Sequence, residues 1–164
     1  MADNALRDKI DNLIATELSS QKPVDRKLID SAIDTILGIV PKRNLEAPYR
    51  TFIKSGIQDE KDELEIALLT RDLWLYDLTS TLEERSTIAT RIGPSTYIQL
   101  MKYHTLESEQ AAQGNDEPPY RATLTIYGPT EGSLIYTAEG NRRLVEKLIS
   151  FSEVCMQLAT RSRP

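Results

Sequence analysis

The residue types that most often carry catalysis or bind metal ions are scarce in this chain of 164 residues. His104 is the single histidine and Cys155 the single cysteine, so the sequence offers no His/Cys cluster of the kind that binds zinc or iron. Seven glycines are scattered along the chain, and none belongs to a glycine-rich phosphate-binding loop. We therefore predict no catalytic residue, no metal site and no cofactor, and we expect the protein not to be an enzyme.

An acidic run at residues 59–63 is the remaining candidate for metal or acid–base chemistry. Carboxylates are also favoured in the first turn of a helix, where they interact with the partial positive charge of the helix N-terminus. We interpret the run as a helix start, with a metal or acid–base site as the alternative.

One local pattern could bind nucleic acid. Residues 88–99 resemble a helix-turn-helix, with Ala89 at the small position of the first helix and Gly93 at the turn. A degenerate helix-turn-helix at 85–104 would make the protein a nucleic-acid-binding regulator. The contacts would come from the second helix, at Ser95, Thr96, Gln99 and Lys102. The net charge of −5 and the few basic residues nearby favour a protein partner over nucleic acid.

A β-hairpin is predicted near the C-terminal end. Residues 121–127 alternate polar and apolar side chains, residues 128–132 have turn composition, and residues 133–137 form a second strand. Two strands are marginally stable alone, and their open edges can pair with another chain. We therefore predict that a protein partner, or a second copy, binds at this hairpin or at the last helix. The candidate partner-binding residues are Thr123, Thr125, Tyr127, Leu134 and Tyr136.

The elements that position these residues are predicted to be mostly helices. Residues 64–78, which contain the single tryptophan, Trp74, carry apolar side chains on nearly every side of a helix, as a buried helix does. Other apolar periods predict helices from residue 3 or 4 to 18 and at 25–40, 48–55, 82–92 and 95–106. Asp25 caps the helix at 25–40, and Asn141 caps a long last helix, with Cys155 on its apolar stripe.

These elements predict an α+β fold that is predominantly α. A bundle of about six helices spans residues 1–106 around the central apolar helix. Residues 107–119 are a flexible acidic linker, since they are rich in Glu, Gln, Gly and Pro without an apolar period. The β-hairpin and the C-terminal helix, residues 120–164, pack back on the bundle as one domain.

Composition narrows the class of protein. Forty per cent hydrophobic and 27% charged residues are typical of a globular domain, and no run approaches the ~20 apolar residues of a membrane span. A single cysteine forms no internal disulfide, so we expect a soluble, cytoplasmic protein that does not bind membranes. The predicted function is that of a non-enzymatic interaction or assembly subunit acting through hetero- or homo-oligomerisation. A structural building block of a viral or helical assembly is a further alternative.

Overall fold

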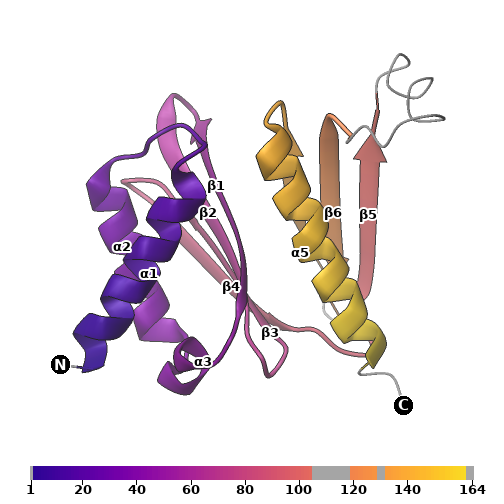
Figure 1. Cartoon of the computed structure of the whole chain (residues 1–164), viewed down its shortest axis with the longest axis horizontal. Coiled ribbons are helices and arrows are strands. Elements are labelled where there is room, and N and C mark those ends of the chain that lie inside the picture. The colour runs from indigo at the N-terminus through magenta and orange to yellow at the C-terminus, as the bar shows by residue number, and fades with distance from the viewer. Residues whose placement is uncertain (1, 105–118, 129–131, 162–164) are drawn as a thin grey trace. The chain divides into compact units, whose positions relative to one another are not determined.

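The computed structural model describes residues 2–104, 119–128 and 132–161 (Figure 1). These residues form four helices and seven strands, and the strands make two antiparallel sheets. The chain divides into two compact units, Met1–Arg91 and Ile92–Pro164. The predicted bundle of about six helices is therefore wrong, because five of the seven strands lie in the part of the chain that was expected to be helical.

The first unit begins with helices. These are α1 (Ala2–Leu18), α2 (Arg26–Ile39) and the short α3 (Lys42–Glu46). The first two were predicted correctly, because their apolar residues recur at helical spacing. The carboxylate of Asp25 accepts a hydrogen bond of 2.8 Å from the backbone N–H of Lys27, which caps α2 as predicted.

Four antiparallel strands complete the first unit, in the order β1 (Arg50–Gln58), β2 (Lys61–Leu69), β3 (Trp74–Ser80) and β4 (Arg85–Arg91). One face of this sheet carries Ile53, Ile66 and Leu78, which lie side by side on neighbouring strands. Helices α1 and α2 cover that face (Figure 1). The resulting core contains Leu6, Ile10, Ile14, Leu18, Leu28, Ala32, Ile33, Ile36, Val40, Leu45, Ile53, Leu64, Ile66, Leu68 and Leu78.

The predicted central helix at 64–78 is instead the second half of β2, a turn, and most of β3. Ala67, Leu68 and Leu69 are all buried, so successive residues on opposite faces of the strand are apolar. A strand buried on both faces reads as a continuous apolar run, which periodicity cannot distinguish from a buried helix. The turn is fixed by Asp72, whose carboxylate accepts hydrogen bonds from the Thr70 hydroxyl and the Asn44 side-chain amide.

Three more predicted helices are strands. The segment expected as a helix at 48–55 lies mainly in β1, the one at 82–92 contains β4, and the one at 95–106 contains β5 (Tyr97–Tyr103). The Thr81 side chain caps a turn here and not the start of a helix. The Thr81 hydroxyl accepts hydrogen bonds from the backbone N–H groups of Glu83 and Glu84, in the turn that joins β3 to β4.

The second unit is a three-stranded sheet with one long helix. Its strands lie in the order β5, β6 (Arg121–Tyr127) and β7 (Ser133–Glu139), followed by α5 (Arg142–Arg161). The predicted hairpin and last helix are confirmed, and Asn141 caps α5 by accepting a 3.2 Å hydrogen bond from the N–H of Leu144. Cys155 is buried, and burial raises the pKa of its thiol to about 12.

Helix α5 packs against all three strands of this sheet. The packed side chains come from alternate strand positions and from one stripe of the helix. They are Ala122, Leu124, Ile126, Tyr136, Ala138, Leu144, Val145, Leu148, Phe151 and Cys155. Of the predicted linker at 107–119, only Pro119 is among the described residues.

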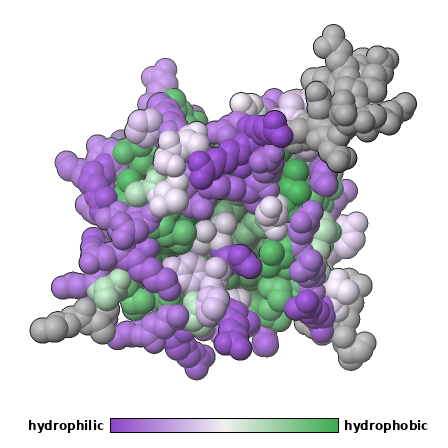
Figure 2. All heavy atoms as spheres, in the orientation of Figure 1, coloured by the Kyte–Doolittle hydropathy of each residue, from purple (hydrophilic) through white to green (hydrophobic). Residues whose placement is uncertain are grey.

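The surface on the helical side of the first unit is mainly hydrophilic (Figure 2). In the view of Figure 2, hydrophilic side chains cover most of the helical side of the first unit, and apolar residues show in smaller areas. Within the described ranges, no helix combines the length and the apolar character that crossing a membrane requires.

Candidate protein-interaction surface

The β5–β6–β7 sheet has one face packed on α5 and a second face against which no other described helix or strand of its own unit packs. Successive side chains of a strand point to opposite faces, so the strand positions that alternate with the α5-facing ones share this second face. We call it the outer face. It consists of Tyr97, Gln99, Met101 and Tyr103 of β5, Arg121, Thr123, Thr125 and Tyr127 of β6, and Ser133, Ile135, Thr137 and Glu139 of β7.

Large apolar and aromatic side chains on the outer face are exposed. Tyr97 is 61% exposed and Ile135 60%, and Met101 and Tyr127 are also exposed. Tyr97 lies opposite Tyr127 in the β5–β6 register, and their ring centroids are 5.7 Å apart with planes tilted by 44°. Tilted rings at this distance attract each other, so the pair forms one broad aromatic surface.

Neighbouring side chains hold one another in place. The Arg121 guanidinium lies over the Tyr103 ring, with its central carbon 4.0 Å from the ring centroid. The Tyr103 hydroxyl donates to the Met101 sulfur at 3.7 Å, and the hydroxyl oxygens of Thr123 and Thr137 are 3.5 Å apart. Side chains that are already ordered lose little rotational freedom when a partner binds.

The outer face carries little charge. Its charged residues are Arg121 and Glu139, which are of opposite sign and lie directly opposite each other on β6 and β7. Interface centres are typically poor in charged residues and rich in Tyr, Met and Arg. The outer face has that composition, although 27% of the whole chain is charged.

The predicted partner-binding residues divide between the two faces. Thr123, Thr125 and Tyr127 lie on the outer face, whereas Leu134 and Tyr136 lie on the face that packs on α5. Tyr136 is buried, so its side chain is part of the core. The sequence interpretation missed Tyr97, Met101 and Ile135. Alternation would have revealed Tyr97 and Met101 had residues 97–103 been interpreted as a strand. Ile135 lies in the strand that was predicted at 133–137, between Leu134 and Tyr136, and alternation there already places it on the opposite face from these two.

The predicted helix-turn-helix at 85–104 is wrong, because β4 and β5 occupy most of this segment. Ser95 and Thr96 lie in a turn in which Thr96 N–H donates to Gly93 C=O at 3.0 Å, and the Thr96 hydroxyl accepts from Gly93 N–H at 2.9 Å. Gln99 lies on the outer face and Lys102 on the α5 side of β5. No recognition helix brings these four residues together, so the nucleic-acid alternative has lost its structural basis.

The acidic run at 59–63 is not a helix start. Asp59 and Glu60 have positive φ angles of 50° and 64° and form the turn between β1 and β2, and the rest of the run begins β2. Across the described residues, no group of three or more His, Cys, Asp and Glu side chains is placed to bind a metal ion.

Among the described carboxyl groups, Glu65 has the pKa that is shifted most clearly from its ordinary value. It lies on the sheet face opposite α1 and α2, directly across from Lys54, and burial raises its pKa to about 7. Lys54 opposes this shift, while Asp77 and Glu63 add to it. Within the described structure its Oε1 atom is buried without a hydrogen-bond partner. Glu65 can therefore hold a proton near neutral pH, which affects stability directly.

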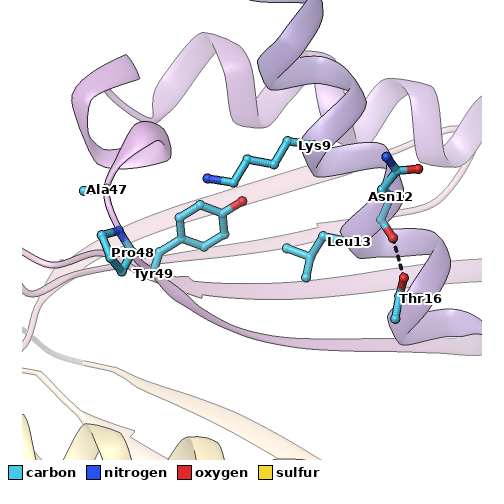
Figure 3. A pocket seen from close by; sticks show the side chains of 7 residues that line it. All are labelled: Lys9, Asn12, Leu13, Thr16, Ala47, Pro48 and Tyr49. Atoms are coloured by element: carbon cyan, nitrogen blue, oxygen red, sulfur yellow. Dashed lines mark hydrogen bonds between the residues drawn. The ribbon is translucent and has the colours of Figure 1, made fainter.

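A pocket of about 430 Å³ opens in the first unit, between α1 and the segment that joins α3 to β1 (Figure 3). Its wall is formed by Lys9, Asn12, Leu13, Thr16, Ala47, Pro48 and Tyr49. The Lys9 ammonium donates to Leu45 C=O at 2.9 Å and lies 5.1 Å from the centroid of the Tyr49 ring. The one cationic group of the wall is thus already engaged, and the pocket offers mainly apolar surface.

Comparison with known proteins gives no family for this chain: no protein-family model matches it, and no match is found among curated proteins or solved structures.

Proposed function

We propose that this protein is a non-enzymatic interaction or assembly subunit that binds another polypeptide chain through the outer face of the β5–β6–β7 sheet. The observation that carries the proposal is the exposure of Tyr97, Met101, Tyr127 and Ile135 together on one nearly uncharged sheet face. Apolar side chains gathered in one patch commonly mark a protein-binding site, whereas single exposed apolar residues do not.

The energetics favour a protein partner. Burying an aliphatic or aromatic side chain contributes about 1.5–3 kcal/mol when it passes fully from water into a packed contact. Several such side chains, already fixed by ring–ring and ring–guanidinium contacts, supply the central anchors that dominate binding energy in protein interfaces. On β6, Thr123 is partly exposed and adds a polar hydroxyl group to this face, whereas Thr125 is buried.

A matched pair of substitutions tests the proposal. Ile135→Asp places a carboxylate on the outer face, at the middle of strand β7, and Ile57→Asp places the same group in the first unit. The two isoleucines are exposed to the same extent, 60% and 59%. Loss of the isoleucine contact together with burial of a charge should weaken binding by about 2 kcal/mol or more, which is roughly thirtyfold.

The assay is sedimentation of the purified protein over a dilution series, combined with co-purification of partners from the native source. We expect an assembly or a bound partner with the unaltered protein and with Ile57→Asp, and its loss with Ile135→Asp. Sedimentation distinguishes a second copy, including a repeating assembly, from a different protein. A monomer at high concentration with no co-purifying partner would contradict the proposal, as would equal behaviour of the two variants.

A further inference from the structure

Strand β4 ends the first sheet and is the most exposed of the seven described strands. All of its residues except Thr90 are exposed, and Ile88, at its centre, is a large apolar side chain. It pairs with β3 on one side only, without a break in register from Arg85 to Arg91. An edge strand that is regular, free of proline and uncovered on its faces can accept another strand.

The backbone groups on the open side of β4 follow from the hydrogen-bond alternation. Thr70 N–H donates to Trp74 C=O, and Thr81 N–H donates to Glu84 C=O, at the two turns that flank β3. In an antiparallel ladder, hydrogen-bonded and non-hydrogen-bonded pairs alternate. Counting from these turns, the backbone of Ile88 faces β3, and the N–H and C=O groups of Thr87 and Ala89 point to the open side.

The opposite edge of the same sheet, on β1, is capped at Ile53 and Ser55. The side-chain amide of Gln21 donates to Ile53 C=O at 2.8 Å and accepts from Ser55 N–H at 2.9 Å, as the backbone of an added strand would. The Ser55 hydroxyl also donates to Lys22 C=O at 2.7 Å. No such contact is recorded for the backbone of Thr87 or Ala89 in the described part of the chain. Among the described residues, the first sheet thus has one edge capped at Ile53 and Ser55 and one edge whose backbone is open at Thr87 and Ala89.

Charge indicates what fits the open edge. Arg85 and Arg91 lie at the two ends of β4, on the same face of the sheet. The Arg85 guanidinium donates to the Thr35 hydroxyl at 2.9 Å, so this contact leaves its positive charge unneutralised. A second copy paired antiparallel along the whole strand would set Arg85 opposite Arg91 twice, and like charges directly opposite destabilise a sheet.

We infer that the open edge of β4 accepts an extended segment of a partner polypeptide that carries an acidic residue opposite Arg85 and an apolar residue opposite Ile88. The segment adds antiparallel to β4 and hydrogen-bonds to the backbone of Thr87 and Ala89. Backbone hydrogen bonds supply affinity in this mode of binding, and the alternating side chains supply specificity. The site lies in the first unit and does not depend on the outer face of the second.

The probe is a synthetic peptide with capped ends and the seven-residue length of β4, with glutamate at both ends, valine in the middle and threonine elsewhere. The control peptide has lysine in place of both glutamates. Binding to the full chain is followed by the NMR shifts of the Thr87 and Ala89 amides. We expect the glutamate peptide to bind at least about tenfold more tightly and to lose this advantage at high salt.

The matched protein variants are Ala89→Pro and Ala89→Thr. Proline removes only an N–H that points away from β3, so the first sheet should keep its own hydrogen bonds, which the NMR spectrum checks. We expect about tenfold weaker peptide binding for Ala89→Pro and near-normal binding for Ala89→Thr. Ile135→Asp should bind the peptide as the unaltered protein does, which separates this inference from the proposed function.

Several results would overturn the inference. Equal binding of the glutamate and lysine peptides would show that the edge of β4 does not select an acidic partner. NMR shifts confined to residues outside β4 would show that the peptide binds elsewhere on the protein. Normal peptide binding by Ala89→Pro would exclude strand addition. A dimer of the unaltered protein that Ala89→Pro dissociates would identify a second copy as the occupant instead.

Discussion

Glu65 provides a quantitative test of the first sheet. Burial raises the pKa of this carboxyl group from 4.5 to about 7. The folded-state pKa lies above the unfolded value, so between about pH 4.5 and 7 the folded protein holds a proton that the unfolded chain has released. The free energy of unfolding therefore falls as the pH rises through this window and levels off above it.

The size of this effect follows from the shift. A difference of about 2.5 pKa units corresponds to roughly 3 kcal/mol, at about 1.4 kcal/mol per unit. Glu65→Gln keeps the shape of the side chain and removes the titration. We expect this variant to be similar in stability to the unaltered protein at pH 4.5 and more stable by roughly 2–3 kcal/mol at pH 8.

The assay is urea unfolding of both proteins at several pH values between 4.5 and 8, followed by circular dichroism. Groups that do not interact with Glu65 titrate equally in both proteins, so the difference between the two unfolding free energies reports the ionisation of Glu65 together with its coupling to neighbouring charges. A difference that does not change with pH would show that the folded protein leaves the acidity of Glu65 unaltered. A variant that becomes relatively less stable at pH 8 would mean that the ionised carboxylate is stabilised in the fold.

Three further outcomes follow from the first unit. Gln21→Ala should lower the free energy of unfolding by about 1–3 kcal/mol, because it leaves a C=O and an N–H of β1 without their partner, and denaturant unfolding measures this. Hydrogen bonding, chiefly from Thr70, lowers the pKa of Asp72, so its contribution is present above the unfolded pKa and is lost as the pH falls through the folded one. Asp72→Asn should flatten the acid side of a stability–pH profile, and an unchanged profile would contradict this. Trp74 is 36% exposed, so its emission should be red-shifted and readily quenched by acrylamide, whereas a blue, protected spectrum would contradict the structure.

The elements that were predicted correctly from the sequence are those whose residue pattern fits only one type of secondary structure. Helices α1, α2 and α5 carry a single apolar stripe, and Asp25 and Asn141 make the predicted capping hydrogen bonds. The β6–β7 hairpin alternates over its first strand and has turn residues between its strands. In each case the local pattern and the tertiary environment agree.

The errors have a common physical cause. Strand β2 is buried on both faces near its end, so its apolar run lacks the alternation of a half-exposed strand. The turn that separates β2 from β3 depends on Asn44, which is distant in sequence, holding Asp72. The local sequence around β2 and β3 therefore favoured a helix. The strands form instead because they pair with segments that are distant in the chain.

Only part of the outer face could be predicted from the sequence, because the face depends on which strands pair with one another. Alternation in β6 located Thr123, Thr125 and Tyr127 on a common face of the hairpin. Tyr97 and Met101 belong to that face only because β5 pairs with β6, and residues 95–106 had been interpreted as a helix. The surface emerges from the pairing of strands that are separated in the chain.

The most direct test of the proposed function is hydroxyl-radical footprinting of the protein in its assembled and separated states. Labelling of Tyr97, Met101 and Tyr127 should fall several-fold on assembly, because these exposed side chains become buried. Labelling of Ile57, which is exposed in the first unit, should stay the same. Unchanged labelling of the three outer-face residues in an assembled sample would contradict the claim that this face binds the partner.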